Sequence, residues 1–214
     1  MKNYILSLAL VVAALAVSAS PASAAVIDFE SLLQTDAGFH LQGFSYSEDG
    51  FTLLSDPPSG GLGFISFGTD NPLFTGSTSL ANNAIGGLTE LALTGGGAFS
   101  LDSIKLAGFN GPTALDVTFT GDTGGGPVTQ TFSLVGTPGG ETFTFAGFGN
   151  VTKVSWNQGG NFNDLVVNAA HQFDNIVVTA NNGNAVPEPA SLALLGLGLA
   201  GLALIRRGAR QQLR

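Results

Sequence analysis

The 214-residue chain carries 15 acidic against 7 basic residues, is 44% hydrophobic and only 10% charged, and contains 31 Gly and no Cys. Because so few Lys and Arg are available to neutralise a phosphate backbone, we expect no nucleic-acid partner. The absence of cysteine excludes disulfide scaffolds, thiolate metal centres and cysteine nucleophiles. The low charge and the 16 Phe residues are typical of a folded chain and not of a disordered one.

The N-terminus has the pattern of a secretory signal peptide. Lys2 precedes a nearly unbroken apolar run from Ile5 to Val17, and Ala22-Ser23-Ala24 supplies the small residues of a cleavage site. The run has 13 residues, fewer than the roughly 20 that a membrane-spanning helix needs. We therefore predict a signal helix, residues 1–24, that is removed after residue 24, with an uncleaved anchor as the alternative.

The C-terminus has a second apolar run, from Ala190 to Ile205, followed by a basic end. As a helix its 16 residues would extend about 24 Å, close to the roughly 30 Å of the hydrocarbon core of a bilayer. We predict a transmembrane helix over 190–205 and a basic stop-transfer end over 206–214. Positive residues mark the cytoplasmic side of such a span, and here they are Arg206, Arg207, Arg210 and Arg214.

Directly before this run, Val186, Pro187, Glu188 and Pro189 interrupt any helix. Proline cannot continue a helix and keeps the residue before it extended, so we expect an exposed joint that a processing enzyme can reach.

Taken together, the Pro-Glu-Pro motif, the Gly- and Leu-rich span and the arginines resemble a PEP-CTERM sorting signal, a tail found in exopolysaccharide-producing Gram-negative bacteria. The resemblance implies that an exosortase, a transpeptidase-like membrane protease, recognises and removes the tail. It also implies transient anchoring in the inner membrane, followed by release to the cell surface or the extracellular matrix. Some similar tails are named after ice-binding proteins, a name that concerns sorting and not activity. An ordinary single-span anchor is the alternative.

Between these ends, residues 25–185 form a stretch of 161 residues, which suits a single domain with one core. The stretch contains 14 of the 15 acids but only two basic residues, Lys105 and Lys153, so its formal charge is 2 − 14 = −12. A domain this acidic repels anionic polysaccharide unless cations bridge the two.

Alternating apolar and polar residues predict strands through most of this domain. In the segment 115–120 every second side chain is apolar, so one face would be buried and the other wet. Gly-rich turns at 95–97, 124–127 and 138–140 separate such segments. The other predicted strands are 26–29, 43–46, 51–54, 63–67, 88–93, 98–106, 128–134, 141–145, 151–156 and 172–179.

These short strands, without a convincing amphipathic helix, predict an all-β domain. We expect an antiparallel β-sandwich of the jelly-roll kind, flanked by the N-terminal signal helix and the C-terminal transmembrane helix. A β-solenoid is the alternative, and the lack of a fixed repeat period argues against it.

The first and last predicted strands resemble those of secreted jelly-roll domains of the galactose-binding and carbohydrate-binding-module kind, through Asp28-Phe29-Glu30 and the segment 171–178. The resemblance implies that the terminal strands are neighbours and that Glu30 and Asp174 hold a structural calcium ion, a cation that prefers hard oxygen ligands. The alternative is that both carboxylates are solvated, with Asp174 and Asn175 forming a side-chain turn bond.

No metalloprotease, phosphate-binding or serine-hydrolase motif is recognisable in the chain. His40 and His171 are the only histidines, and we expect His171 at a turn or a strand edge. The 14 acids of the domain could include a glycosidase pair, but nothing in their spacing suggests one. Because the domain also lacks Cys and Arg, we predict that it is not an enzyme.

Three sequence patterns bear on whether the domain binds a sugar, ice or calcium. Sugar-binding faces usually present exposed Trp or Tyr, whereas we expect Trp156 in the core. Three Thr-x-Thr pairs, at 118 and 120, 129 and 131, and 142 and 144, would lie on one sheet face and resemble an ice-binding surface, although Thr is common on any wet strand face. The stretch 159–167 resembles a single calcium-binding nonapeptide, which we expect to be a loop.

The sequence therefore predicts an exported, non-enzymatic surface or matrix protein, sorted through its tail and associated with exopolysaccharide or biofilm. The alternative is a carbohydrate-binding module of the jelly-roll type with a structural calcium, which would need an exposed aromatic platform or a calcium-lined pocket. A hydrolase would need convergent carboxylates or a histidine-centred triad in a cleft.

Overall fold

The computed structural model describes residues 24–56, 61–83, 86–109, 115–135, 139–158 and 170–181. Within these ranges the chain forms antiparallel strands and one short 3-10 turn, η1 (Glu30–Leu32), and no helix is long and apolar enough to cross a membrane. The predicted signal helix over most of its length, the predicted transmembrane helix and the basic end lie outside the described residues. The boundaries set for them remain predictions.

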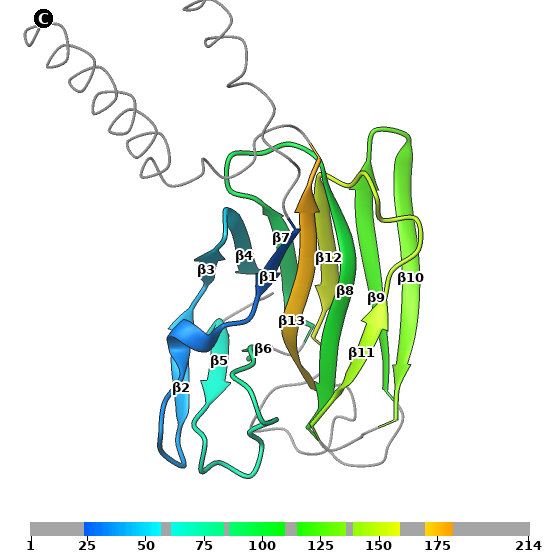
Figure 1. Ribbon diagram of the computed structural model, residues 1–214. Coiled ribbons are helices and arrows are strands. Elements are labelled where there is room, and N and C mark those ends of the chain that lie inside the picture. The colour runs from blue at the N-terminus through cyan, green and yellow to red at the C-terminus, as the bar shows by residue number, and fades with distance from the viewer. Residues whose placement is uncertain are drawn as a thin grey trace, which may run out of the picture.

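Most strands overlap the predicted ranges, whereas the strand at 81–82 and most of the strand at 39–43 were not predicted (Figure 1). In chain order they are β1 (Ala24–Ile27), β2 (Phe39–Gly43), β3 (Ser45–Glu48), β4 (Phe51–Asp56), β5 (Phe64–Phe67), β6 (Ala81–Asn82), β7 (Leu88–Leu93), β8 (Phe99–Gly108), β9 (Leu115–Thr123), β10 (Gly126–Leu134), β11 (Glu141–Thr144), β12 (Lys153–Asn157) and β13 (His171–Ala180).

The strands form three sheets, with the orders β1-β13-β8-β11, β10-β9-β12-β7-β4-β3 and β2-β5-β6. Every ladder between named strands is antiparallel. The first described strand lies beside the last, since Ala24 is paired with Thr179 and Ile27 with Ile176 (Figure 1). This confirms the expectation that the terminal strands are neighbours.

The predicted alternation explains why two of these sheets pack face to face. In β9 the apolar Val117 and Phe119 are buried, whereas the alternating Asp116 and Thr118 are exposed. One continuous core draws buried residues from the four-stranded and the six-stranded sheet, so the architecture is a β-sandwich. The prediction of an all-β antiparallel sandwich is confirmed for the described residues.

The aromatic rings of the core meet at Phe173 of β13. Its ring lies 5.2 Å from that of Trp156 in the six-stranded sheet, 6.0 Å from that of Phe64 in the three-stranded sheet and 5.8 Å from that of Phe29, which follows β1. All three contacts are edge-on, the geometry that aromatic quadrupoles favour. Trp156 is 2% exposed, so the prediction that it belongs to the core is confirmed.

Three local predictions were wrong. The predicted strand 43–46 spans a break, because β2 ends at Gly43, whose φ of 80° ends the ladder, and β3 begins at Ser45. His171 is fully buried in β13 and does not lie at a turn. Thr142 and Thr144 belong to β11 in the four-stranded sheet, so the three Thr-x-Thr pairs do not share a face.

Gly121 in β9 offers a test of this packing. A Cβ atom at this position would lie 2.7 Å from Val151 Cγ1 and 2.9 Å from Phe148 Cε1, both in the core. We expect Gly121→Ala to lower the free energy of unfolding by about 1–3 kcal/mol through overpacking. The matched control is Gly108→Ala in β8, where a Cβ would meet nothing within 4 Å. Denaturant midpoints measure both; equal midpoints would contradict the packing described.

Candidate functional site

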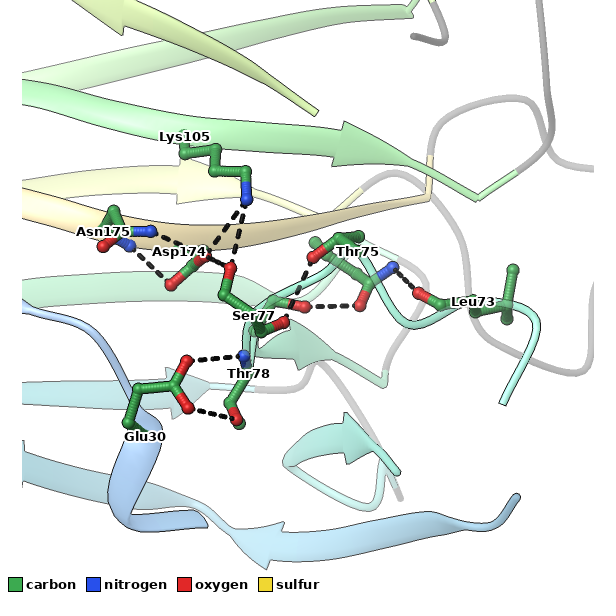
Figure 2. Close-up of polar contacts among 10 residues, drawn as sticks. Glu30, Leu73, Thr75, Ser77, Thr78, Lys105, Asp174 and Asn175 are labelled. Carbon is green, nitrogen blue, oxygen red and sulfur yellow. Dashed lines mark hydrogen bonds and ion pairs between the residues drawn. The ribbon is translucent and has the colours of Figure 1, made fainter. Parts of the chain in front are cut away.

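The predicted metal ligand Asp174 lies in β13 and is 2% exposed. Its carboxylate accepts hydrogen bonds from the Ser77 hydroxyl and from the backbone N (2.7 Å) and side-chain Nδ2 (2.9 Å) of Asn175. Lys105 Nζ lies 3.5 Å from Asp174 Oδ2 and donates to Ser77 Oγ over 3.1 Å (Figure 2). The bonds to Asn175 are the side-chain turn bonds of the alternative to a metal site, but the other half of that alternative, a solvated Asp174, is wrong because its carboxylate is buried.

The second predicted metal ligand, Glu30, lies in η1 and is exposed. Its carboxylate accepts hydrogen bonds from the backbone N (2.9 Å) and the hydroxyl (3.3 Å) of Thr78. The two carboxylates therefore hold successive residues, Thr78 and Ser77, of the segment between β5 and β6 (Figure 2). In the parts of the chain that the structure describes, no three His, Cys, Asp or Glu side chains are grouped so that they could hold a metal ion.

The local backbone explains how a charged residue becomes buried on the outer side of a sheet. Asp174 and Lys105 are cross-strand neighbours, and the register of β13 against β8 shifts directly after Asp174, where Asn175 adopts a φ of 47°. Neighbouring side chains of a strand point to opposite faces, so Asp174 points away from the core that holds Phe173.

The segment between β5 and β6 covers this outer side. Ser79 Oγ donates to Gln172 Oε1 over 2.6 Å, and Gln172 Nε2 donates to the Leu73 carbonyl over 2.9 Å. Leu80 and Phe173 exchange two backbone hydrogen bonds of 3.0 and 2.8 Å. The polar segment is thereby fixed to β13 and shields Asp174 from solvent.

The electrostatics of this cluster depend on Lys105. Burial raises the pKa of Asp174 above its usual 3.8, whereas the hydrogen bond from Ser77 and the ammonium group of Lys105 act in the opposite direction. Lys105 supplies, next to Asp174, the positive charge that we predicted a calcium ion would supply.

A second candidate site is a groove of about 320 Å³ in the outer face of the six-stranded sheet. Its lining comes from three adjacent strands, β9, β12 and β7, and consists of Leu88, Asp116, Thr118, Thr120, Ser155, Trp156 and Asn157. Trp156 is 2% exposed, so the groove has no aromatic platform and is lined mainly by hydroxyl, amide and carboxylate groups.

The strand register extends this polar lining toward β10. Thr120 stands opposite Thr129, and Thr118 stands opposite Thr131, with 2.8 Å between the two hydroxyl oxygens of the latter pair. The Ser133 hydroxyl donates to Asp116. Two of the three predicted Thr-x-Thr pairs thus share one face with the groove. Sequence reasoning predicted neither the groove nor the contributions of β7 and β12 to it.

Near the groove, the basic residue Lys153 is paired with acidic residues, whereas the lining itself contains the acidic residue Asp116. Lys153 Nζ lies 2.8 Å from Glu90 Oε1 and 3.7 Å from Asp122 Oδ2, and its hydrogen bond with Glu90 raises its pKa. Lys153 is thus committed to acidic neighbours. Asp116 is the one titratable residue in the lining, so the lining lacks the pair of carboxylates that glycoside hydrolysis uses.

The histidines lie apart from both candidate sites. His40 Nε2 lies 2.9 Å from Asp36 Oδ1, a contact that lowers the pKa of Asp36. The His171 carbonyl accepts a hydrogen bond of 3.0 Å from Gln158 Nε2. The sorting motif residues, the C-terminal arginines and the nonapeptide-like stretch 159–167 lie outside the described residues.

Comparison with known proteins identifies the tail. The family model described as "PEP-CTERM protein-sorting motif" matches residues 185–207. The prediction of a PEP-CTERM tail is therefore confirmed, and such a tail implies an exported protein that an exosortase processes. No curated protein matches the chain.

Solved structures similar to this chain include a family 29 carbohydrate-binding module, with 14% identity, a TM-score of 0.40 and coverage of 81% of this chain and 99% of that module. Another is the family 11 carbohydrate-binding module of the cellulosomal cellulase Lic26A-Cel5E of Clostridium thermocellum, with 10% identity, a TM-score of 0.30 and coverage of 76% and 97%. The chain itself carries a PEP-CTERM protein-sorting motif at its C-terminus.

Proposed function

We propose that this protein is a non-enzymatic component of the cell surface or extracellular matrix of a Gram-negative bacterium. The observation that carries the proposal is the sorting motif at residues 185–207, which marks the chain for export. The chain is anchored in the inner membrane through its tail, released by an exosortase, and then associated with exopolysaccharide in a biofilm.

The non-enzymatic part of the proposal is supported by the lining of the groove. A hydrolase needs a base or nucleophile, an orienting partner and a stabiliser of developing charge. The groove contributes Asp116 as its one titratable side chain, and a serine hydroxyl is already bonded to it.

As a second function, we propose that the outer-face groove binds a neutral polysaccharide. Its hydroxyl, amide and carboxylate groups can donate hydrogen bonds to sugar hydroxyls and accept hydrogen bonds from them, while the domain charge of 2 − 14 = −12 disfavours anionic chains.

For the fold, we propose the jelly-roll type of sandwich. Successive strands from β10 to β13 alternate between the two large sheets, which supports this proposal.

For the buried cluster we propose that Lys105 neutralises Asp174. An ammonium group 3.5 Å from the carboxylate would repel a dication at the same oxygen. Calcium at Glu30 and Asp174 stays a prediction, and the last experiment below tests it together with Lys105.

Sorting can be tested at Glu188. We expect Glu188→Ala to leave the protein in the membrane fraction, because the acidic residue between the two prolines is part of the motif that the exosortase reads. The control is Glu141→Ala, far from the tail in sequence. Mass spectrometry of wild-type protein from the matrix should find no peptide that contains Arg214; recovery of intact Arg214 there would refute the proposal.

Binding in the groove can be tested at Asp116. A titration with neutral hexasaccharides of glucose, mannose and galactose should perturb the amide resonances of Thr118, Thr120 and Ser155. Asp116→Ala should weaken binding about tenfold or more, because it removes a charged hydrogen-bond acceptor. The matched control is Asp102→Ala, an exposed carboxylate in β8 that also accepts from a hydroxyl, that of Thr179. Equal losses in the two variants would contradict a site at the groove.

Stability tests the cluster around Asp174. Lys105→Met should cost about 3–5 kcal/mol near pH 7, because it leaves a buried carboxylate without its cation. Lys153→Met is the control, since its side chain is 39% exposed and its ion pair should contribute at most about 1 kcal/mol.

The pH dependence has a defined sign. Because the pKa of Asp174 is raised on folding, the folded state holds this proton more firmly, and the free energy of unfolding falls as pH rises through 3.8 and the folded pKa. Removing the Lys105 charge raises that pKa further, so the gap between wild type and Lys105→Met should be small near pH 3 and widen toward neutral pH. A gap that is constant with pH would argue against the ion pair.

Melting temperatures measured in calcium and in chelator complete the test. A difference between the two buffers that the double variant Glu30→Gln with Asp174→Asn abolishes would establish the calcium site instead.

A further inference from the structure

Among the described strands, one long edge strand of the sandwich has no neighbour on its outer side. The edge strands of the two large sheets are β1, β3, β10 and β11. Among them β1, β3 and β11 have four residues each, whereas β10 has nine and pairs with β9 over its whole length without a register shift. Figure 1 shows β10 at the margin of the sandwich, with β9 on its inner side.

The hairpin between β9 and β10 fixes which backbone groups point outward. Gly124 and Gly125 form a two-residue turn closed by the pair Thr123 and Gly126, which in such a hairpin is a hydrogen-bonded pair. Since hydrogen-bonded and non-bonded pairs alternate along an antiparallel ladder, Val128, Gln130 and Phe132 also bond to β9. The backbone groups of Pro127, Thr129, Thr131 and Ser133 therefore point away from β9.

These outward groups find no backbone partner among the described residues. The N–H groups of Thr129, Thr131 and Ser133 and the four carbonyls form a row that another strand could complete. Natural edge strands are usually protected by charged residues, bulges or proline. On β10, Pro127 at the start of the strand provides such protection. The Gln130 side chain also bonds to the Thr144 carbonyl and to the Ala146 N–H, but these bonds leave the outward backbone groups of β10 free of backbone partners among the described residues.

Charge indicates what pairs with this edge. No Asp, Glu, Lys or Arg occurs from Thr123 to Gly140, a stretch of 140 − 123 + 1 = 18 residues in a domain with a formal charge of −12. Two copies of so acidic a domain repel each other over most of their surface. Along β10 they can approach without bringing charged residues of the two strands into contact.

We propose that β10 is a self-association edge, at which a second copy of this chain adds its own β10 in antiparallel orientation about a two-fold axis. The pairing joins the two six-stranded sheets into one continuous sheet. The two-fold axis is perpendicular to this sheet, so both outer-face grooves lie on the same side.

The test measures the mass of the mature protein, recovered after export, by light scattering between ~1 and ~500 µM, a range suited to small interfaces. We expect a concentration-dependent dimer. Thr131→Pro should weaken dimerisation about tenfold or more, because it removes an outward N–H from both copies without breaking the ladder to β9. Thr131→Lys should act in the same direction by adding like charges, and the matched control is Thr144→Lys on the edge strand β11.

Because the chain contains no cysteine, Thr131→Cys introduces a single thiol and should form a disulfide-linked dimer in mild oxidant, whereas Thr144→Cys should not. A wild-type protein that stays monomeric throughout the range would overturn the proposal. So would a dimer whose stability is unchanged in Thr131→Pro and Thr131→Lys, or equal cross-linking at the two positions, since the copies would then meet elsewhere.

Discussion

The packing of Phe173 is the contact on which the three sheets depend. Its ring meets rings contributed by the six-stranded sheet, by the three-stranded sheet and by the residue after β1, while its backbone bonds to Leu80. The next residue, Asp174, points to the other side of the same strand and binds Ser77. One dipeptide thus joins the apolar core to the polar segment that covers the sheet. A change at either residue disturbs two layers at once.

Much of this fold could be predicted because most strands have one wet face. Period-two alternation located β9, β10 and β11 to within three residues at each end. The pattern fails where both faces are covered, as in β6, whose Ala81 and Asn82 are both buried. It also missed that Phe44 separates two strands, because the left-handed backbone of Gly43 leaves no mark in the hydrophobic pattern.

The candidate sites were less predictable than the strands. Asp174 was predicted as a calcium ligand, with a solvated carboxylate as the alternative, and its ion pair with Lys105 was not foreseen. Lys105 lies 69 residues away in sequence (174 − 105), and only the β8–β13 register brings the two together. The groove combines Asp116 and Thr118 with Ser155 and Leu88 from two other strands. No local sequence pattern predicts this grouping, because each of these residues alone is typical of the solvent-exposed face of a strand. The sorting motif was recognisable from the sequence, since its recognition depends on a continuous stretch of residues. The helix over 190–205 and the basic end stay predictions.

The position of β13 has a mechanical consequence. This last described strand is not at an edge: β1 flanks it on one side and β8 on the other. A pull on the chain beyond Ala180 therefore acts along the strand and loads the hydrogen bonds of two ladders together. Detaching β13 therefore breaks the ladders to both β1 and β8, whereas detaching an edge strand breaks a single ladder. Because Ala24 lies beside Thr179, β1 begins and β13 ends at the same pole of the sandwich (Figure 1). A domain attached through that pole keeps its opposite pole turned away from its attachment.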